Sequence, residues 1–232
     1  DSQIELLKTF ADQAVIAVQN VRLFTELEAR NSELRVALEQ QTATSKILQV
    51  MSASPTDTQP VFEAVAESAA RLCEAYDAAI FRRDGDRLRL VAHLGPIPMG
   101  GGIGEFSLPL GRGTGPGRSV VDGRTIHVAD LQAEVHEFPQ GGELARQLGF
   151  RTTLNAPLMR EGVAIGTITV RRTEARLFTE RQVALLQTFA DQAVIAIENV
   201  RLFTELATRN SELRVALEQQ TATSELLKVV GR

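Results

Sequence analysis

The chain has 232 residues, enough for one domain of ordinary size with additional helix, and its 44% apolar residues can form a core. The net charge is −4 and the longest basic runs are pairs, which argues against electrostatic binding of nucleic acid, because that binding needs clustered Lys and Arg. The single cysteine, Cys73, excludes an intramolecular disulfide and a multi-thiolate metal site and indicates a reducing compartment, so we expect a cytoplasmic location. No apolar run in the sequence approaches the roughly 20 residues of a membrane span, so we expect no membrane partner.

Glycine and proline divide the chain into three parts. Of 17 glycines, 16 lie between positions 85 and 166, and proline is absent from 1–54 and 158–232. Both residues mark turns and destabilise helix interiors, so the flanks predict long helices and the middle predicts strands and loops. We therefore expect a connector helix over 1–50, a globular core over 51–181, and a closing helix that continues into a second connector over 182–232.

The first connector is repeated in the second. Residues 3–50 align with 182–229 at an offset of 179, with 38 of 48 positions identical, whereas 51–181 has no second copy. The repeat unit is about one domain plus one connector, which predicts that the parent protein carries such domains in tandem. The chain starts at Asp1 without an initiator methionine, and we expect it to be a fragment of that longer protein.

Each connector carries apolar residues at the 3-4 spacing of a two-stranded coiled coil. A helix with such a stripe must bury it against a partner, and we expect a parallel homodimer; an intramolecular helical hairpin is the alternative. We expect Asn31 and Asn210, which are polar residues at seam positions, to set the register of this dimer. The stripe in the first half of each connector is out of phase with this repeat, a slip that locally alters the supercoil. The predicted dimer seam comprises Phe24, Leu27, Asn31, Leu34, Leu38, Phe203, Leu206, Asn210, Leu213 and Leu217.

The middle segment predicts an α+β fold. A helix should begin at residue 58 or 59, with Pro60 in its first turn. Two strands around Asp84-Gly85-Asp86 should form a hairpin, and a second hairpin should lead into the closing helix. In chain order, the elements expected after the first helix are strands at 78–82, 88–92 and 106–110, a helix at 117–121, a strand at 125–128, a helix at 143–148, and strands at 151–158 and 164–171.

This order of elements carries a family resemblance. The segments that carry it are VVDGRTIHVADL, GFRTTLNAPL, GVAIGTITVRR and LFTERQVALLQTFADQAVIAI. Over about residues 46–200 the chain resembles the GAF domain of bacterial signalling proteins, and the connectors resemble the helices between tandem GAF units. The resemblance implies a GAF-like antiparallel sheet between a dimerising helical layer and a face with a ligand pocket. It also implies a sensory or dimerisation module upstream of an output such as a histidine kinase or nucleotide cyclase.

Two of the predicted strands carry polar residues on one face. A central strand normally hides apolar side chains on both faces unless one face meets water or a polar ligand, so we expect these polar faces to coincide at a pocket. An aromatic wall and one of two charged residues would complete it. The alternative is that threonine is simply favoured in strands and that the charges are paired structurally. The candidate pocket residues are Phe81, Arg118, Asp130, Thr153, Asn155, Thr167 and Thr169.

Enzymatic motifs are absent from the sequence. No Walker lysine or GxGxxG stretch occurs, and His127, Asp130, Glu134 and His136 fit no familiar metal-ligand spacing. Some proteins that this chain resembles attach a bilin through a pocket cysteine or reduce methionine sulfoxide with several thiols, and this sequence lacks those residues. The residue pattern of cyclic-nucleotide-binding members is only partly present. We therefore predict no catalytic residue, metal or cofactor in the fragment. We expect a sensory and dimerisation module that binds an unidentified small molecule and signals through coiled-coil helices to an output domain; the alternative is a non-binding dimerisation spacer between tandem units.

Overall fold

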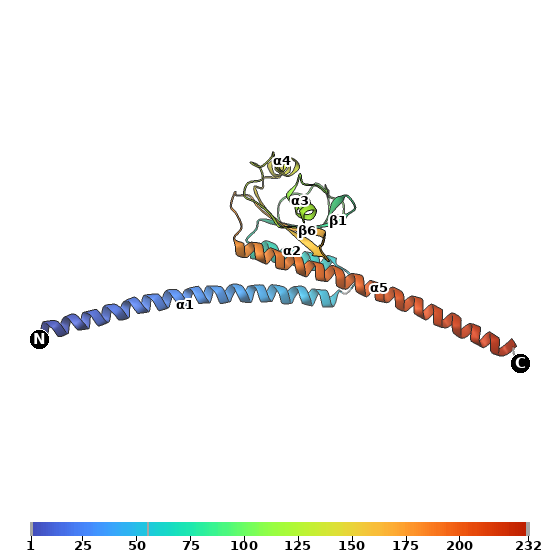
Figure 1. The fold of residues 1–232 in the computed structure, drawn as a ribbon, viewed down its shortest axis with the longest axis horizontal. Helices are drawn as coiled ribbons and strands as arrows, with labels where there is room; N and C mark the ends of the chain where they lie inside the picture. The colour runs from blue at the N-terminus through green and yellow to red at the C-terminus, as the bar shows by residue number, and fades with distance from the viewer. Residues whose placement is uncertain (1, 55, 231–232) are drawn as a thin grey trace. The chain divides into compact units, whose positions relative to one another are not determined.

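The computed structural model describes residues 2–54 and 56–230, and the side chains of all of these except 2–12, 14, 32 and 221–230. The chain falls into two compact units, residues 1–45 and 46–232. Most of helix α1 (Ser2–Ala53) makes up the first unit. The second unit contains the end of α1 and all the other helices and strands, which are labelled in Figure 1.

A six-stranded antiparallel sheet forms the centre of the second unit, in the order β3-β2-β1-β6-β5-β4. Two hairpins build most of it, β1–β2 and β5–β6. The latter turns through Glu161 and Gly162, which both have positive φ, as a two-residue hairpin loop of the favoured twist requires. The strands are β1 (Asp77–Asp84), β2 (Arg87–Leu94), β3 (Ser107–Pro109), β4 (Ile126–Val128), β5 (Thr152–Arg160) and β6 (Val163–Arg172).

Helices cover both faces of the sheet. Helices α2 (Gln59–Leu72) and α5 (Glu180–Val230) pack against each other and against the strands, and we call them the helical layer. On the opposite face lie α3 (Gly115–Asp122), which contacts β5 and β6, and α4 (Pro139–Leu148) (Figure 1). The α+β class predicted from the sequence, with an antiparallel sheet between helices, is confirmed.

The two-residue period of the strands sorts the side chains between these faces. In β6, Ile168 and Val170 are completely buried, whereas Thr167 and Thr169 hydrogen-bond to groups on the α3 side of the sheet. On the helical side, α5 buries Leu186, Phe189 and the small residues that follow them. From 201 to 220 every side chain of α5 that the structure describes is exposed.

One predicted boundary is wrong. The sequence indicates a helix only from residue 143, but α4 begins at Pro139 and includes Gly141 and Gly142. These glycines are needed for close packing: a Cβ at Gly142 would lie 2.9 Å from Val135 Cγ2. The two glycines therefore serve the packing of α4 and do not form a turn.

Neither long helix contains, in its described residues, a stretch apolar enough to cross a bilayer.

Candidate functional site

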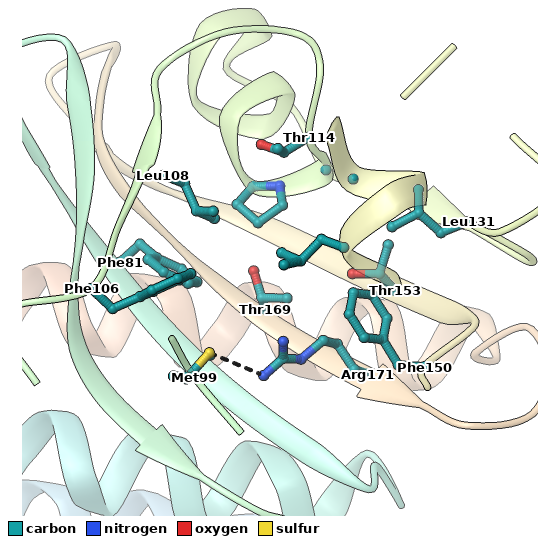
Figure 2. A pocket seen from close by; sticks show the side chains of 14 residues that line it. Phe81, Met99, Phe106, Leu108, Thr114, Leu131, Phe150, Thr153, Thr169 and Arg171 are labelled. Carbon is teal, nitrogen blue, oxygen red and sulfur yellow. Dashed lines mark hydrogen bonds between the residues drawn. The ribbon is translucent and has the colours of Figure 1, made fainter. Parts of the chain in front are cut away.

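A cavity of about 30 Å³ lies between the sheet and the α3–α4 side of the second unit. It has room for one or two water molecules, so a small-molecule ligand requires its walls to move apart. Strands β1, β3, β5 and β6, helices α3 and α4, and four loop segments contribute to it (Figure 2). Its lining residues are Phe81, Met99, Phe106, Leu108, Thr114, Gly115, Pro116, Leu131, Gly141, Leu144, Phe150, Thr153, Thr169 and Arg171.

Most of the cavity wall is apolar. Figure 2 shows Phe81 and Phe106 on one side and Phe150 and Leu131 on the other. The rings of Phe81 and Phe106 pack at a tilt of 54° with centroids 6.4 Å apart. Two facing aromatic walls favour a ligand with a compact apolar body, because its burial removes apolar area from water.

Threonines from neighbouring strands supply hydroxyl groups to the cavity. Thr153 and Thr169 line it, and Thr169 Oγ1 donates to Asn155 Oδ1 at 2.9 Å. Asn155 itself is completely buried behind the lining, where its Nδ2 donates to the carbonyl oxygen of Ile126. It holds Gly115 at close range, since a Cβ there would lie 2.6 Å from Nδ2 of Asn155.

Thr167 lies on the same face of the sheet but does not line the cavity. Its hydroxyl donates to the carbonyl oxygen of Ala156 at 3.0 Å and lies 3.4 Å from Ser119 Oγ on α3. Thr167 and Asn155 therefore position the strands and α3 around the cavity. The other two predicted polar residues, Thr153 and Thr169, face into it.

One charged side chain lines the cavity, Arg171 at the end of β6. Its Nε donates to Asp77 Oδ1 at 2.8 Å, and its Nη2 also pairs with that oxygen. The other carboxylate oxygen, Oδ2, lies 2.8 Å from His93 Nε2 and accepts from the backbone N–H of Ile97 at 3.2 Å. Burial lowers the pKa of the Arg171 guanidinium, and the Asp77 carboxylate opposes that effect. The cavity thus contains a buried cation whose partner is fully hydrogen-bonded.

Arg118 and Asp130, the two predicted charged closures, do not line the cavity. Arg118 pairs with Glu137 and stacks over the ring of Phe138, with Cζ 3.9 Å from the ring centroid. Asp130 pairs with Arg151, and their hydrogen bond lowers the pKa of the Asp130 carboxyl. Both residues hold the segment between β4 and α4. The charge in the cavity is that of Arg171, and neither Arg118 nor Asp130 contributes to it.

The histidine of β4 is also used structurally. His127 Nε2 accepts a hydrogen bond from the backbone N–H of Phe178 at 3.0 Å, which places the ring proton on Nδ1. Burial, with a smaller effect of Arg172, lowers the pKa of His127 and favours this neutral form. Over the part of the chain that the structure describes, no group of three or more His, Cys, Asp or Glu side chains is arranged to hold a metal ion.

The charged centre of the site, Arg171 with Asp77 and His93, is not among the residues predicted from the sequence. Arg171 continues the alternation of Thr167 and Thr169, and this pattern predicts that it lies on the same face of β6. Asp77 and His93 meet it only through the pairing of β1 with both β2 and β6, which brings together residues 94 positions apart. No local sequence pattern predicts the contact of Asp77 with Arg171 and His93.

The family model of the GAF domain matches residues 57–197, which is more than half of the chain. The chain belongs to the GAF domain family. GAF domains are sensory and signalling modules that often bind small molecules and often dimerise. A search of the curated proteins returned no match.

Solved structures share this fold. The GAF domain of an Acinetobacter phosphoenolpyruvate-protein phosphotransferase is 18% identical with a TM-score of 0.59, over 70% of this chain and 95% of that one. Residues 122 to 287 of a methyl-accepting chemotaxis protein are 23% identical with a TM-score of 0.58, over 69% and 98%. The free methionine-R-sulfoxide reductase of Neisseria meningitidis, in complex with its substrate, is 22% identical with a TM-score of 0.58, over 72% and 93%. At these identities the likeness establishes the fold.

Proposed function

We propose that this GAF domain senses a small molecule in the cavity and passes the bound state to α5. The observation that carries the proposal is the alternation of β6. Thr169 and Arg171 line the cavity, and the residues next to each of them, Val170 and Arg172, are buried on the helical side. A ligand that moves β6 must therefore also move the residues against which the helical layer packs.

Specific bonds tie the sheet to the start of α5. Arg172 Nη2 donates to the carbonyl oxygen of Cys73 at 2.8 Å, and Gln182 Nε2 donates to the same oxygen at 2.9 Å. Farther along α5, Glu198 pairs with Arg160 of β5 at 3.0 Å. Because α5 contains no glycine or proline up to residue 230, a displacement at its start passes along the helix as a shift or rotation. A ligand that favours one packing by ~1.4 kcal/mol would change the population ratio tenfold.

The output of this motion in our proposal is a parallel coiled-coil homodimer through the two connectors. In the second connector Phe203, Leu206, Leu213 and Leu217 have exposed fractions of 46–68%, and their spacing is that of a coiled-coil seam. A second copy of the chain presents the same seam, so the stripes can bury each other. An output domain such as a histidine kinase or nucleotide cyclase would receive the signal from these helices.

A ligand screen with cavity variants tests the sensor proposal. A metabolite library is added to the full chain, and binding is measured as an increase in melting temperature. Leu144→Trp, at the half-buried cavity wall on α4, should fill the site and abolish the shift. Gln147→Trp, on the exposed side of the same helix, is the matched control and should keep it.

The two function hypotheses give different results in this screen. A compound that stabilises the wild type and the Gln147 variant, but not the Leu144 variant, supports a sensor. If no compound stabilises the wild type, the domain is a dimerisation spacer whose cavity holds no ligand.

A further inference from the structure

Arg171 has one guanidinium nitrogen that the protein leaves unused. Its Nε and Nη2 make the hydrogen bonds to Asp77, and Nη2 also lies 3.9 Å from Met99 Sδ. Within the described part of the chain, Nη1 has no acceptor, although the side chain is only 6% exposed. Figure 2 shows one nitrogen of Arg171 directed at Met99 and another turned toward Thr169 and the space between the aromatic walls. Nη1 is not fully buried, because it keeps some contact with the cavity space, and there it can donate to water or to a ligand atom that accepts hydrogen bonds.

The position of this guanidinium is fixed before any ligand arrives. Asp77 holds two of its three nitrogens, and Asp77 is itself held by His93 and the backbone N–H of Ile97. The ring of Phe150 lies 5.1 Å from Cζ of Arg171. Because three donor groups share the negative charge of Asp77, the free side of Arg171 keeps an attraction for an anion. Preorganisation of this kind reduces the entropy lost on binding.

The other lining groups restrict the charge of the ligand. No acidic side chain is among the residues that line the cavity, and the nearest carboxylate, Asp77, lies behind Arg171 and is paired with it. Thr114 Oγ1 accepts from the backbone N–H of Gly117, and its hydroxyl hydrogen stays available at the α3 end of the cavity, across from Arg171 (Figure 2). One free guanidinium nitrogen suits a single carboxylate, whereas a dianion such as a phosphate would meet the nearby Asp77 with too few donors.

We propose that the ligand is a compact monocarboxylate with an apolar body, whose carboxylate accepts hydrogen bonds from Nη1 of Arg171. The aromatic walls move apart to receive the apolar body. This inference rests on the proposed function, because it names the ligand class of the same cavity.

Matched pairs of probes test this ligand class. Isovalerate, benzoate and phenylacetate are compared by calorimetric titration with their primary amides, which have nearly the same shape and no charge. We expect at least one carboxylate to bind the full chain at least tenfold more tightly than its amide. The comparison needs no variant, so it does not depend on how substitutions fold.

Variants then assign the preference to Arg171. Asp77→Asn combined with Arg171→Gln removes both charges of the buried pair, which avoids leaving one charge unpaired. Circular dichroism should report a folded protein, and the carboxylate preference should disappear. Arg118→Gln, which removes a guanidinium outside the cavity, is the control and should leave the preference unchanged.

Several results would overturn the inference. If amides bind as tightly as carboxylates, or if only neutral or cationic members of the wider library bind, the ligand class is wrong while the sensor proposal stands. A carboxylate preference that survives in the folded double variant would remove Arg171 from the site. If neither the probe pairs nor the library bind, the sensor proposal fails together with the ligand class.

Discussion

Two consecutive arginines of β6 have opposite roles because a strand directs them to opposite faces. Arg171 faces the cavity and pairs with Asp77. Arg172 is 1% exposed on the helical side, where it donates to several backbone carbonyls and stacks over Phe178 with Cζ 3.9 Å from the ring centroid. One residue thus carries the charge of the site, and its neighbour fastens the strand to the helical layer.

The reactivity of Cys73 tests the packing at this junction. Its thiol is completely buried, burial raises its pKa to about 12, and its Sγ donates to the carbonyl oxygen of Gln182 at 3.6 Å. At pH 8 the thiolate fraction of the folded protein should be roughly 1 in 10,000. We expect an aromatic disulfide reagent to label native protein at least a hundredfold more slowly than protein unfolded in guanidinium. Equal rates would show that this junction is open in solution.

At the residue scale, the sequence predicts the polar lining better than the charged centre. Thr153 and Thr169 line the cavity as their alternation suggests. Arg118 and Asp130 lie elsewhere because loop charges pair with whatever the folded loops bring near, which no periodicity encodes. The site role of the lining residues stays a prediction until a ligand is found.

At the scale of elements, β6 can approach β1 closely only because residue 166 has no side chain. A Cβ at Gly166 would lie 2.3 Å from the carbonyl oxygen of Phe81 and 3.0 Å from Leu158 Cδ1. Gly166→Ala should therefore force the strands apart and lower the free energy of unfolding by about 3 kcal/mol, measured by urea denaturation.

A second glycine provides the control for this measurement. A Cβ at Gly111 would meet no heavy atom within 4 Å, and its backbone is not left-handed, so Gly111→Ala should change stability by less than about 1 kcal/mol. Similar losses for both variants would mean that the effect belongs to glycine in general and not to the contact between strands.

The elements themselves are well predicted from local patterns, and their partners are not. Every strand expected from the sequence is present, because alternation and turn residues are local signals. The repeat makes the limit plain: Ala17 and Ala196 lie in identical VIA segments, yet Ala17 is exposed and Ala196 is completely buried. An apolar pattern identifies the face that needs covering, but the rest of the fold decides what covers it.

At the scale of the whole molecule, the proposed homodimer accounts for the long apolar stripes of both connectors. Leu34 and Leu213 are 68% and 67% exposed at equivalent positions of the two copies. A soluble monomer rarely exposes contiguous apolar surface of this extent. Association through the seam would bury it on both chains.

Light scattering tests the dimer directly. At tens of micromolar the mass should be twice the 25.3 kDa of one chain. Leu34→Asp combined with Leu213→Asp should give a monomer, because each substitution places a charge in a desolvated seam. Val36→Asp with Val215→Asp makes an equal charge change on the opposite side of the same helices and should leave the dimer intact. A wild-type mass of one chain would contradict the seam.

The central claim is that a ligand in the cavity changes how the α5 helices pack in the dimer. The most direct test is the distance between spin labels at Val215→Cys on the two subunits, with Cys73→Ala, measured with and without a compound that binds the cavity. Val215 is 51% exposed and lies opposite the predicted seam, so the label should not disturb association. We predict two distance populations whose ratio changes when the compound is added and stays constant in the Leu144→Trp variant. An unchanged distribution in a sample that binds the compound would contradict the claim.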